Sequence, residues 1–202
     1  MPTGDLCTLS DLTTYLGDPN LLAAPLSALS FLITSVSGWV QGYCERNLAG
    51  PQVYTFTIDG NGQDAIFLPE GPVVSISSVT VDGVPIPASP GAPTYGYMAT
   101  DCEVVIIGGR FNRGRRNVVI TYSAGYPYTF TAGATPAADT LTGTPGDLRW
   151  AVVETVALRY RRRASLGKTS EGLTGQTTSY DNSIAPKDAM GIFNKYKKET
   201  PW

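Results

Sequence analysis

The side chains that most enzymes use for acid-base or nucleophilic chemistry are largely missing from this sequence. It has no histidine and three cysteines, Cys7, Cys44 and Cys102. Without histidine, the commonest general base and metal ligand is absent, and Ser-His-Asp and Cys-His hydrolases are excluded. The cysteines are too few and too widely spaced for a disulfide framework or a zinc signature. We therefore expect no catalytic residues, no metal site and no cofactor.

Two motifs resemble ligand-binding loops but lack required residues. The stretch Ser165 to Thr169 reads Ser-Leu-Gly-Lys-Thr, like the end of a P-loop, but Arg162 stands where that motif needs its first glycine. The spacing of Asp59, Asn61, Gln63 and Glu70 resembles part of a calcium loop, but Asp64 replaces the glycine of its sharp turn. We predict a polar linker at the first stretch and a hairpin turn between strands at the second.

Two arginine clusters remain as groups that could bind a partner. The first comprises Arg110, Arg113, Arg115 and Arg116. It fits a solvated hairpin tip equally well as a contact with DNA phosphates or an acidic protein surface. The second, from Arg159 to Arg163, ends a predicted helix. Cations at a helix C-terminus are favourable there, yet four arginines exceed what this stabilisation needs.

Charge is distributed unevenly along the 202 residues, although the net charge is only -2. Residues 1–109 hold ten acidic and one basic side chain, whereas residues 110–202 hold seven acidic and fourteen basic ones. This asymmetry suits a molecule whose one end meets the opposite end of a neighbour, or whose two ends meet different partners. It does not suit a general nucleic-acid binder, which would be basic overall.

One segment, from Pro19 to Cys44, carries no Asp, Glu, Lys or Arg but has helical periodicity. One face of the predicted helix is apolar, and the other is small and polar without charge. Pro25 and the scattered hydroxyl groups argue against a membrane span. We expect the domain's own core to cover the apolar face and a second copy to contact Ser30, Thr34, Ser37 and Gln41. The alternative is a mildly polar surface helix.

The remaining pattern predicts an α+β fold, a helical bundle with an inserted antiparallel β block and a C-terminal docking helix. Thr8 to Asp11 form a capping box for a short helix that Gly17 ends. Alternating apolar residues predict strands at 53–59, 65–68, 73–81, 95–98, 103–107 and 118–122, and Asp82-Gly83 predicts a tight turn. The expected parts are N-terminal bundle helices (1–50), a β block (51–125), a long flexible loop (126–146), a bundle helix (147–164), and a linker with a docking arm (165–202).

The order of these elements and several local motifs resemble the head-tail connector proteins of tailed bacteriophages, also called head completion or adaptor proteins. The motifs are Leu-x-x-Leu-x-x-Tyr-Leu in the first helix, Trp39 to Leu48, Tyr54-Thr55-Phe56, Leu68 to Val79, Val118 to Tyr126, the arginine-rich helix end and Phe193-x-x-Tyr196. The match spans nearly the whole chain. One departure is the loop from Thr131 to Gly146, which is longer than the family leads us to expect.

The resemblance implies a non-enzymatic ring, commonly twelve-fold, beneath the portal protein at the capsid vertex. Such a ring continues the DNA channel without reading sequence, closes the filled head together with a stopper or tail-completion protein, and lies in the virion neck after synthesis in the host cytoplasm. No membrane partner is implied. By this resemblance the portal-docking residues would be Arg161, Arg162, Arg163, Ile192, Phe193, Tyr196 and Trp202. The alternative for the last helix is packing on its own subunit.

Two other functions remain open from the sequence. One is a tail-side neck or tail-completion ring. The other is a small β module with helical flanks that binds a carbohydrate or nucleic acid.

Overall fold

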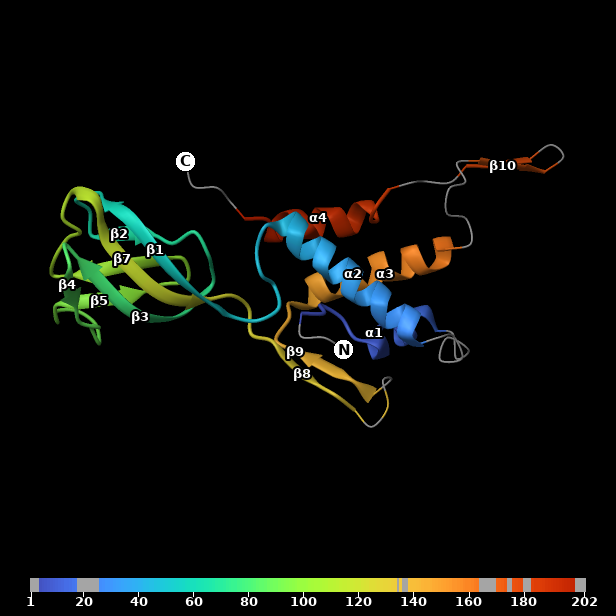
Figure 1. Ribbon diagram of the computed structural model, residues 1–202, viewed down its shortest axis with the longest axis horizontal. Helices are drawn as coiled ribbons and strands as arrows, with labels where there is room; N and C mark the ends of the chain where they lie inside the picture. Colours follow the sequence, from blue (N-terminus) through green and yellow to red (C-terminus); the bar gives the residue numbers. More distant parts are fainter. Residues whose placement is uncertain are drawn as a thin grey trace. The chain divides into compact units, whose positions relative to one another are not determined.

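The computed structural model describes residues 4–17, 26–133, 135, 138–163, 170–173, 176–179 and 183–198. The chain forms two compact units, shown with their elements in Figure 1. The helical unit comprises residues 1–45 and 128–197, and the β unit comprises residues 46–127 and 198–202. The combination of helices with antiparallel sheets confirms the α+β class.

Helix α1 (Leu9–Leu16) has the ends that its sequence predicts. The Thr8 hydroxyl accepts the amide hydrogen of Asp11 at 3.1 Å, and the Asp11 carboxylate accepts that of Thr8 at 2.8 Å. This capping box satisfies backbone donors that a helix start leaves free. At the other end Gly17 takes a left-handed conformation, with φ of 61°, and its amide bonds to the Thr13 carbonyl.

Helices α2 (Leu26–Cys44), α3 (Gly146–Arg162) and α4 (Lys187–Tyr196) pack with α1 into a bundle. The apolar stripe of α2 is buried as predicted. It meets the buried face of α3, which includes Leu148, Val152 and Val156, and Phe193 of α4 is also fully buried. The core therefore joins helices from both ends of the chain. No described helix is long and apolar enough to cross a membrane.

Arg149 of α3 links three elements of the helical unit. Its Nε donates to Asp11 Oδ2 at 2.8 Å, and its Nη2 donates to Asp11 Oδ1 at 2.5 Å. Its Nη1 donates to the carbonyl oxygen of Leu141 at 2.7 Å. A bidentate arginine-carboxylate pair fixes geometry as well as charge. The same carboxylate caps α1, so Arg149 fixes the start of α1 against α3.

Two segments predicted to lack regular structure contain short hairpins. In the predicted loop 126–146, β8 (Thr129–Thr131) pairs antiparallel with β9 (Thr140–Thr142). In the predicted linker, β10 (Ser170–Leu173) pairs with β11 (Gln176–Ser179). Strands this short, rich in Gly and Thr, carry too little alternation of apolar residues to be recognised from the pattern. Both descriptions therefore required correction.

The β unit consists of two antiparallel sheets around one core. The first sheet has the order β1-β7-β3-β4 and the second has the order β2-β6-β5. Their strands are β1 (Gln52–Gly60), β7 (Gly114–Ala124), β3 (Val73–Val81), β4 (Val84–Ile86), β2 (Ala65–Phe67), β6 (Glu103–Ile107) and β5 (Gly96–Ala99). Alternate residues of β7 and β6 are buried, including Val118, Ile120, Val104 and Ile106. These side chains from both sheets form one apolar cluster.

Polar contacts of Tyr122 and Glu70 lie at the edge of this core. The fully buried Tyr122 accepts the amide hydrogen of Glu70 at 3.3 Å, and burial raises the pKa of Tyr122 to about 12. Glu70 in turn contacts Lys198 in an ion pair, with Arg46 Nε at 3.9 Å on its other side. Lys198 follows α4 and belongs to the β unit. The buried carboxylate of Glu70 thus holds it in place.

The turns were only partly predicted. Asp82 and Gly83 form the expected tight turn, both at positive φ, between the paired Val81 and Val84. Residues 59–64, in contrast, do not close the predicted hairpin. β1 pairs with β7, whereas β2 pairs with β6, so the turn takes the chain from one sheet to the other. Alternation shows that a segment is a strand but not which strand it pairs with.

The charge asymmetry along the sequence disappears in the folded units. The helical unit holds ten acidic and nine basic residues, and the β unit holds seven and six. The basic second half of the sequence is shared between the two units, because β7 and the loop before it belong to the β unit. The two halves of the sequence therefore do not correspond to two oppositely charged units.

We predict that Arg149→Ala destabilises the helical unit by about 2 kcal/mol, because it removes charge-assisted hydrogen bonds from three acceptors at once. Chemical denaturation measures this change in the free energy of unfolding. Arg161→Ala on the same helix is the control, since Arg161 is exposed, and its effect is expected to stay within about 0.5 kcal/mol. Equal stability of the two variants would contradict the linking role of Arg149.

Candidate functional site

The described residues contain no group of acidic, cysteine or histidine side chains placed to hold a metal ion. Cys7 and Cys44 are buried, and Cys102 is exposed. Burial raises the pKa of the Cys7 thiol, which keeps it protonated and unreactive. The P-loop-like residues 165–169 lie outside the described residues. The candidate sites are therefore surfaces that other macromolecules could contact.

The polar face of α2 is covered by residues 4–8 of the same chain. The Leu6 amide donates to the Ser37 hydroxyl at 3.0 Å, and Gln41 Nε2 donates to the Gly4 carbonyl at 3.1 Å. Ser37 is only 1% exposed. Thr34 donates to the Ser30 carbonyl at 3.0 Å. The uncharged face thus binds backbone groups of the N-terminal segment, which need hydrogen-bond partners rather than charges.

This finding corrects the copy-to-copy assignment for Ser37, because its hydroxyl is already used inside the subunit. Ser30, Thr34 and Gln41 are partly exposed, and Gln41 also bonds to Gly4 of the N-terminal segment. Contact of these three residues with a second copy stays a prediction. Residues of the N-terminal segment cover this face at Ser37 and Gln41. Nothing in the sequence pattern shows that residues 4–8 return to α2.

Asp5 is the one acidic group in this covering segment. It is 2% exposed, and its backbone carbonyl accepts the Tyr128 hydroxyl hydrogen at 3.1 Å. Burial raises the pKa of the Asp5 carboxyl, and a hydrogen bond from Thr34 acts in the opposite direction. One carboxylate oxygen is buried without a hydrogen bond among the described residues. Its charged form is therefore costly in the folded protein.

The predicted docking helix is an integral part of the bundle. Phe193 is fully buried and packs edge to face on Trp39, with ring centroids 6.0 Å apart. The Tyr196 hydroxyl donates to Asp147 Oδ1 at 2.5 Å, and Ile192 is partly buried. The Phe193 ring therefore fills the subunit's own core, as in the alternative of packing on its own subunit, and its assignment to portal contact stays a prediction. Trp202 lies outside the described residues.

The arginines at the end of α3 differ in their availability. Arg162 donates to the Ser183 carbonyl at 2.8 Å, and Arg163 lies over the Tyr160 ring at 3.8 Å. Arg161 is exposed. Part of this cluster thus holds the chain locally, and Arg161 and Arg163 expose charge to solvent.

The four arginines of the first cluster lie on the β6–β7 connection and the start of β7. Arg110, Arg113, Arg115 and Arg116 are all exposed. The acidic side chains near this cluster bond to backbone and asparagine amide groups. Asp59 accepts the Arg116 amide hydrogen at 2.6 Å, and the two oxygens of Asp82 accept from the side chains of Asn112 and Asn117. These bonds lower the pKa of Asp82.

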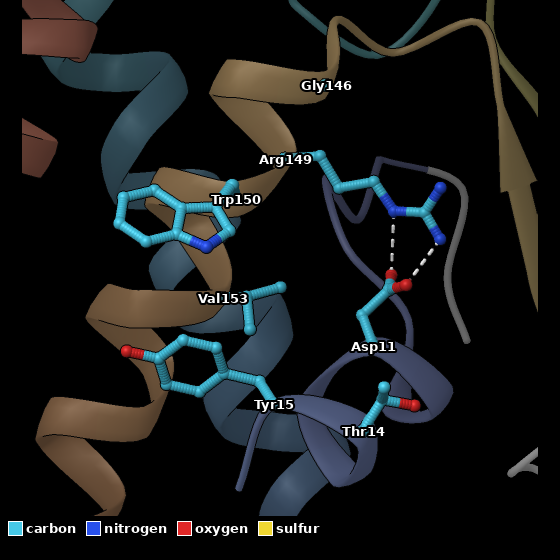
Figure 2. Close-up of a pocket in the computed structure, with 7 residues that line it drawn as sticks. All are labelled: Asp11, Thr14, Tyr15, Gly146, Arg149, Trp150 and Val153. Carbon is cyan, nitrogen blue, oxygen red and sulfur yellow. Dashed lines mark hydrogen bonds and ion pairs between the residues drawn. The ribbon is translucent and has the colours of Figure 1, made fainter.

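A pocket of about 340 Å³ lies between α1 and α3 (Figure 2). Tyr15 and Trp150 form two of its walls and are 41% and 47% exposed. Val153 forms part of the apolar floor, and the ion pair between Asp11 and Arg149 forms one edge. No local pattern predicts this pocket, because its residues come from helices far apart in the chain. The only available signal was the pair of aromatic residues outside the apolar stripes.

The chain matches the model of the head completion protein family over residues 5–199 and belongs to that family. The assignment to the head-tail connector family from sequence motifs is thereby confirmed. The description of this family names a protein that completes the head. No curated protein matches the chain.

Solved structures with a similar fold come from gene transfer agents. One, described as the "Neck of empty GTA particle computed with C6 symmetry", is 18% identical with a TM-score of 0.51, covering 100% of this chain and 95% of that chain. Another, described as the "Virion of native gene transfer agent (GTA) particle", is 18% identical with a TM-score of 0.49, covering 89% and 81% of the two chains. The first likeness shows that the fold is shared over the full length.

We predict that Ser37→Ala destabilises the isolated protein by about 1 to 2 kcal/mol, because the buried Leu6 amide loses its acceptor. Thermal or chemical unfolding measures the effect. Ser35→Ala on the same helix is the matched control, and its effect is expected within about 0.5 kcal/mol. If Ser37→Ala leaves the free energy of unfolding unchanged, the N-terminal segment does not cover α2.

Asp5→Asn is expected to stabilise the protein at pH 7 and to change it little near pH 3.5. The folded-state pKa of Asp5 is raised, so its contribution is favourable below the unfolded-state pKa and is lost as pH rises through the folded-state value. Unfolding temperatures between pH 3.5 and 7 measure this difference. Asp139→Asn, at another carboxyl group with low exposure, is the comparison. A gain that is the same at every pH would rule out ionisation of Asp5 as its cause.

Proposed function

We propose that this protein forms a closed homo-oligomeric ring in the neck and extends the DNA channel from the portal toward the tail. The observation that carries the proposal is the family match, which spans residues 5–199 of 202. Full-length similarity of fold to a neck structure computed with six-fold symmetry supports it. A ring of identical copies needs two different complementary surfaces on each copy.

The proposed role is mechanical and involves no reaction. The ring would hold the packaged DNA in the head by joining the portal on one side and a stopper or tail-completion protein on the other. Exposed arginines suit such contacts better than the buried Phe193 does. Arg161 and Arg163 of the helical unit are candidates for the portal contact, and the four arginines of the β unit are candidates for DNA phosphates or an acidic protein surface.

We predict that particles assembled without this protein contain heads that lack tails and lose their DNA during purification, because the neck is incomplete. Electron microscopy counts tailed particles, and nuclease treatment measures the protected DNA. Supplying the wild-type protein in trans is the control and is expected to restore both values. Normal numbers of tailed, DNA-filled particles without the protein would refute the proposed function.

A further inference from the structure

Four large apolar side chains of the helical unit are exposed among its described residues. They are Tyr15, Phe31, Trp150 and Ile184. Tyr15 and Trp150 form the pocket between α1 and α3. Phe31 stands apart on α2 and is the most exposed of the four, at 74%. The unit therefore presents both an aromatic-walled pocket and a protruding aromatic side chain.

The surroundings of Phe31 allow another molecule to come close. Ser27, Gly38 and Gly42 are also exposed on this side of α2. A β-carbon added at Gly38 or Gly42 would meet no atom within 4 Å, so the subunit itself does not require glycine there. Glycine inside a helix costs up to about 1 kcal/mol relative to alanine. Phe31 thus projects from a flat helix surface.

The pocket and Phe31 lie on opposite sides of the bundle. In Figure 2 the pocket faces the viewer between α1 and α3, and α2 lies behind these helices. The buried residues Ile33, Val36 and Val40 of α2 belong to the bundle core. On a helix, Phe31 lies about 140 to 180° around from these three buried residues, given 100° per residue. It therefore points away from α1 and α3.

The two surfaces are compatible in charge. No Asp, Glu, Lys or Arg occurs in α2. The pocket contains two charged groups, Asp11 and Arg149, and they neutralise each other through a bidentate pair. Contact between the surfaces would leave no charge buried without a partner, and an unpaired buried charge is strongly destabilising. An aromatic ring entering the pocket would meet Tyr15 and Trp150, and aromatic pairs favour such offset or edge-to-face contacts.

We propose that Phe31 of one copy inserts into the pocket formed by Tyr15 and Trp150 of the next copy. Because the two surfaces differ and lie on opposite sides of the bundle, the contact is heterologous. Its repetition with a small rotation at each step closes a ring of many copies. The inference rests on the proposed ring and identifies the contact that would build it. It replaces the predicted interface through Ser37, which is buried.

Photo-crosslinking from position 31 tests the contact directly. The aromatic crosslinker p-benzoylphenylalanine replaces Phe31, and irradiated complexes are digested and analysed by mass spectrometry. We expect crosslinks between copies that map to Tyr15, Trp150 or Val153. The control carries the crosslinker at Phe67, an equally exposed phenylalanine of the β unit, at 66% exposure, and is expected to give no crosslink to the pocket. Both samples are analysed as purified protein and as assembled particles.

Phe31→Ser tests the energetic contribution with a second readout. Because Phe31 is exposed, the variant is expected to fold with an unchanged unfolding temperature, and its self-association is expected to weaken at least tenfold, as for a central aromatic interface residue. Sedimentation velocity over a concentration series measures the association, and Phe67→Ser is the matched control. Trp150→Ser is expected to reproduce the loss.

The outcomes separate the inference from the proposed function. If rings are present but crosslinks from position 31 map elsewhere, or if Phe31→Ser associates like the wild type, this contact is refuted and the ring remains. If the protein is monomeric in particles as well as in solution, both fail. Pocket-directed crosslinks combined with weakened association of Phe31→Ser and Trp150→Ser support the contact.

Discussion

The helical unit depends on one ion pair, between Arg149 of α3 and Asp11 of α1. Asp11 caps its own helix, and Arg149 also binds the backbone before α3 through the Leu141 carbonyl. The pair therefore sets the positions of α1, α3 and β9 relative to one another. It also leaves the edge of the pocket electrically neutral, which lets aromatic walls dominate that surface. A lysine at 149 could supply the charge but not the planar arrangement of three donors.

The second constraint is that the core of the helical unit draws on both ends of the chain. Helices α1 and α2 come before the β unit, and α3 and α4 come after it. Surfaces that look independent in the sequence become parts of one interior, as with Phe193 against Trp39. The same arrangement explains why charge segregated along the sequence is balanced within each unit. The charge of a surface in this protein therefore follows from the folded unit and not from the position of residues along the sequence.

Features that depend on neighbouring residues were predicted well from the sequence. The Thr8–Asp11 capping box, the Asp82-Gly83 turn and the alternating burial of β7 all follow from local geometry. Features that depend on distant partners were not. The pairing of β1 with β7, the covering of Ser37 by Leu6 and the pocket between Tyr15 and Trp150 each join segments that no local pattern connects. Phe193 shows the same limit, because an amphipathic helix looks alike whether its apolar face meets its own bundle or another protein.

The antiparallel pairing of Gln52 with Ala124 has a consequence for synthesis on the ribosome. Helices α1 and α2 emerge long before α3, the partner that completes their core, so they must wait with apolar surface unsatisfied. The inserted strands can fold during this interval, because their core is contained within residues 54–124. Their folding brings the two ends of the insert together and replaces a long flexible connection by a short one. The entropy of closing that connection is then already paid when α3 arrives.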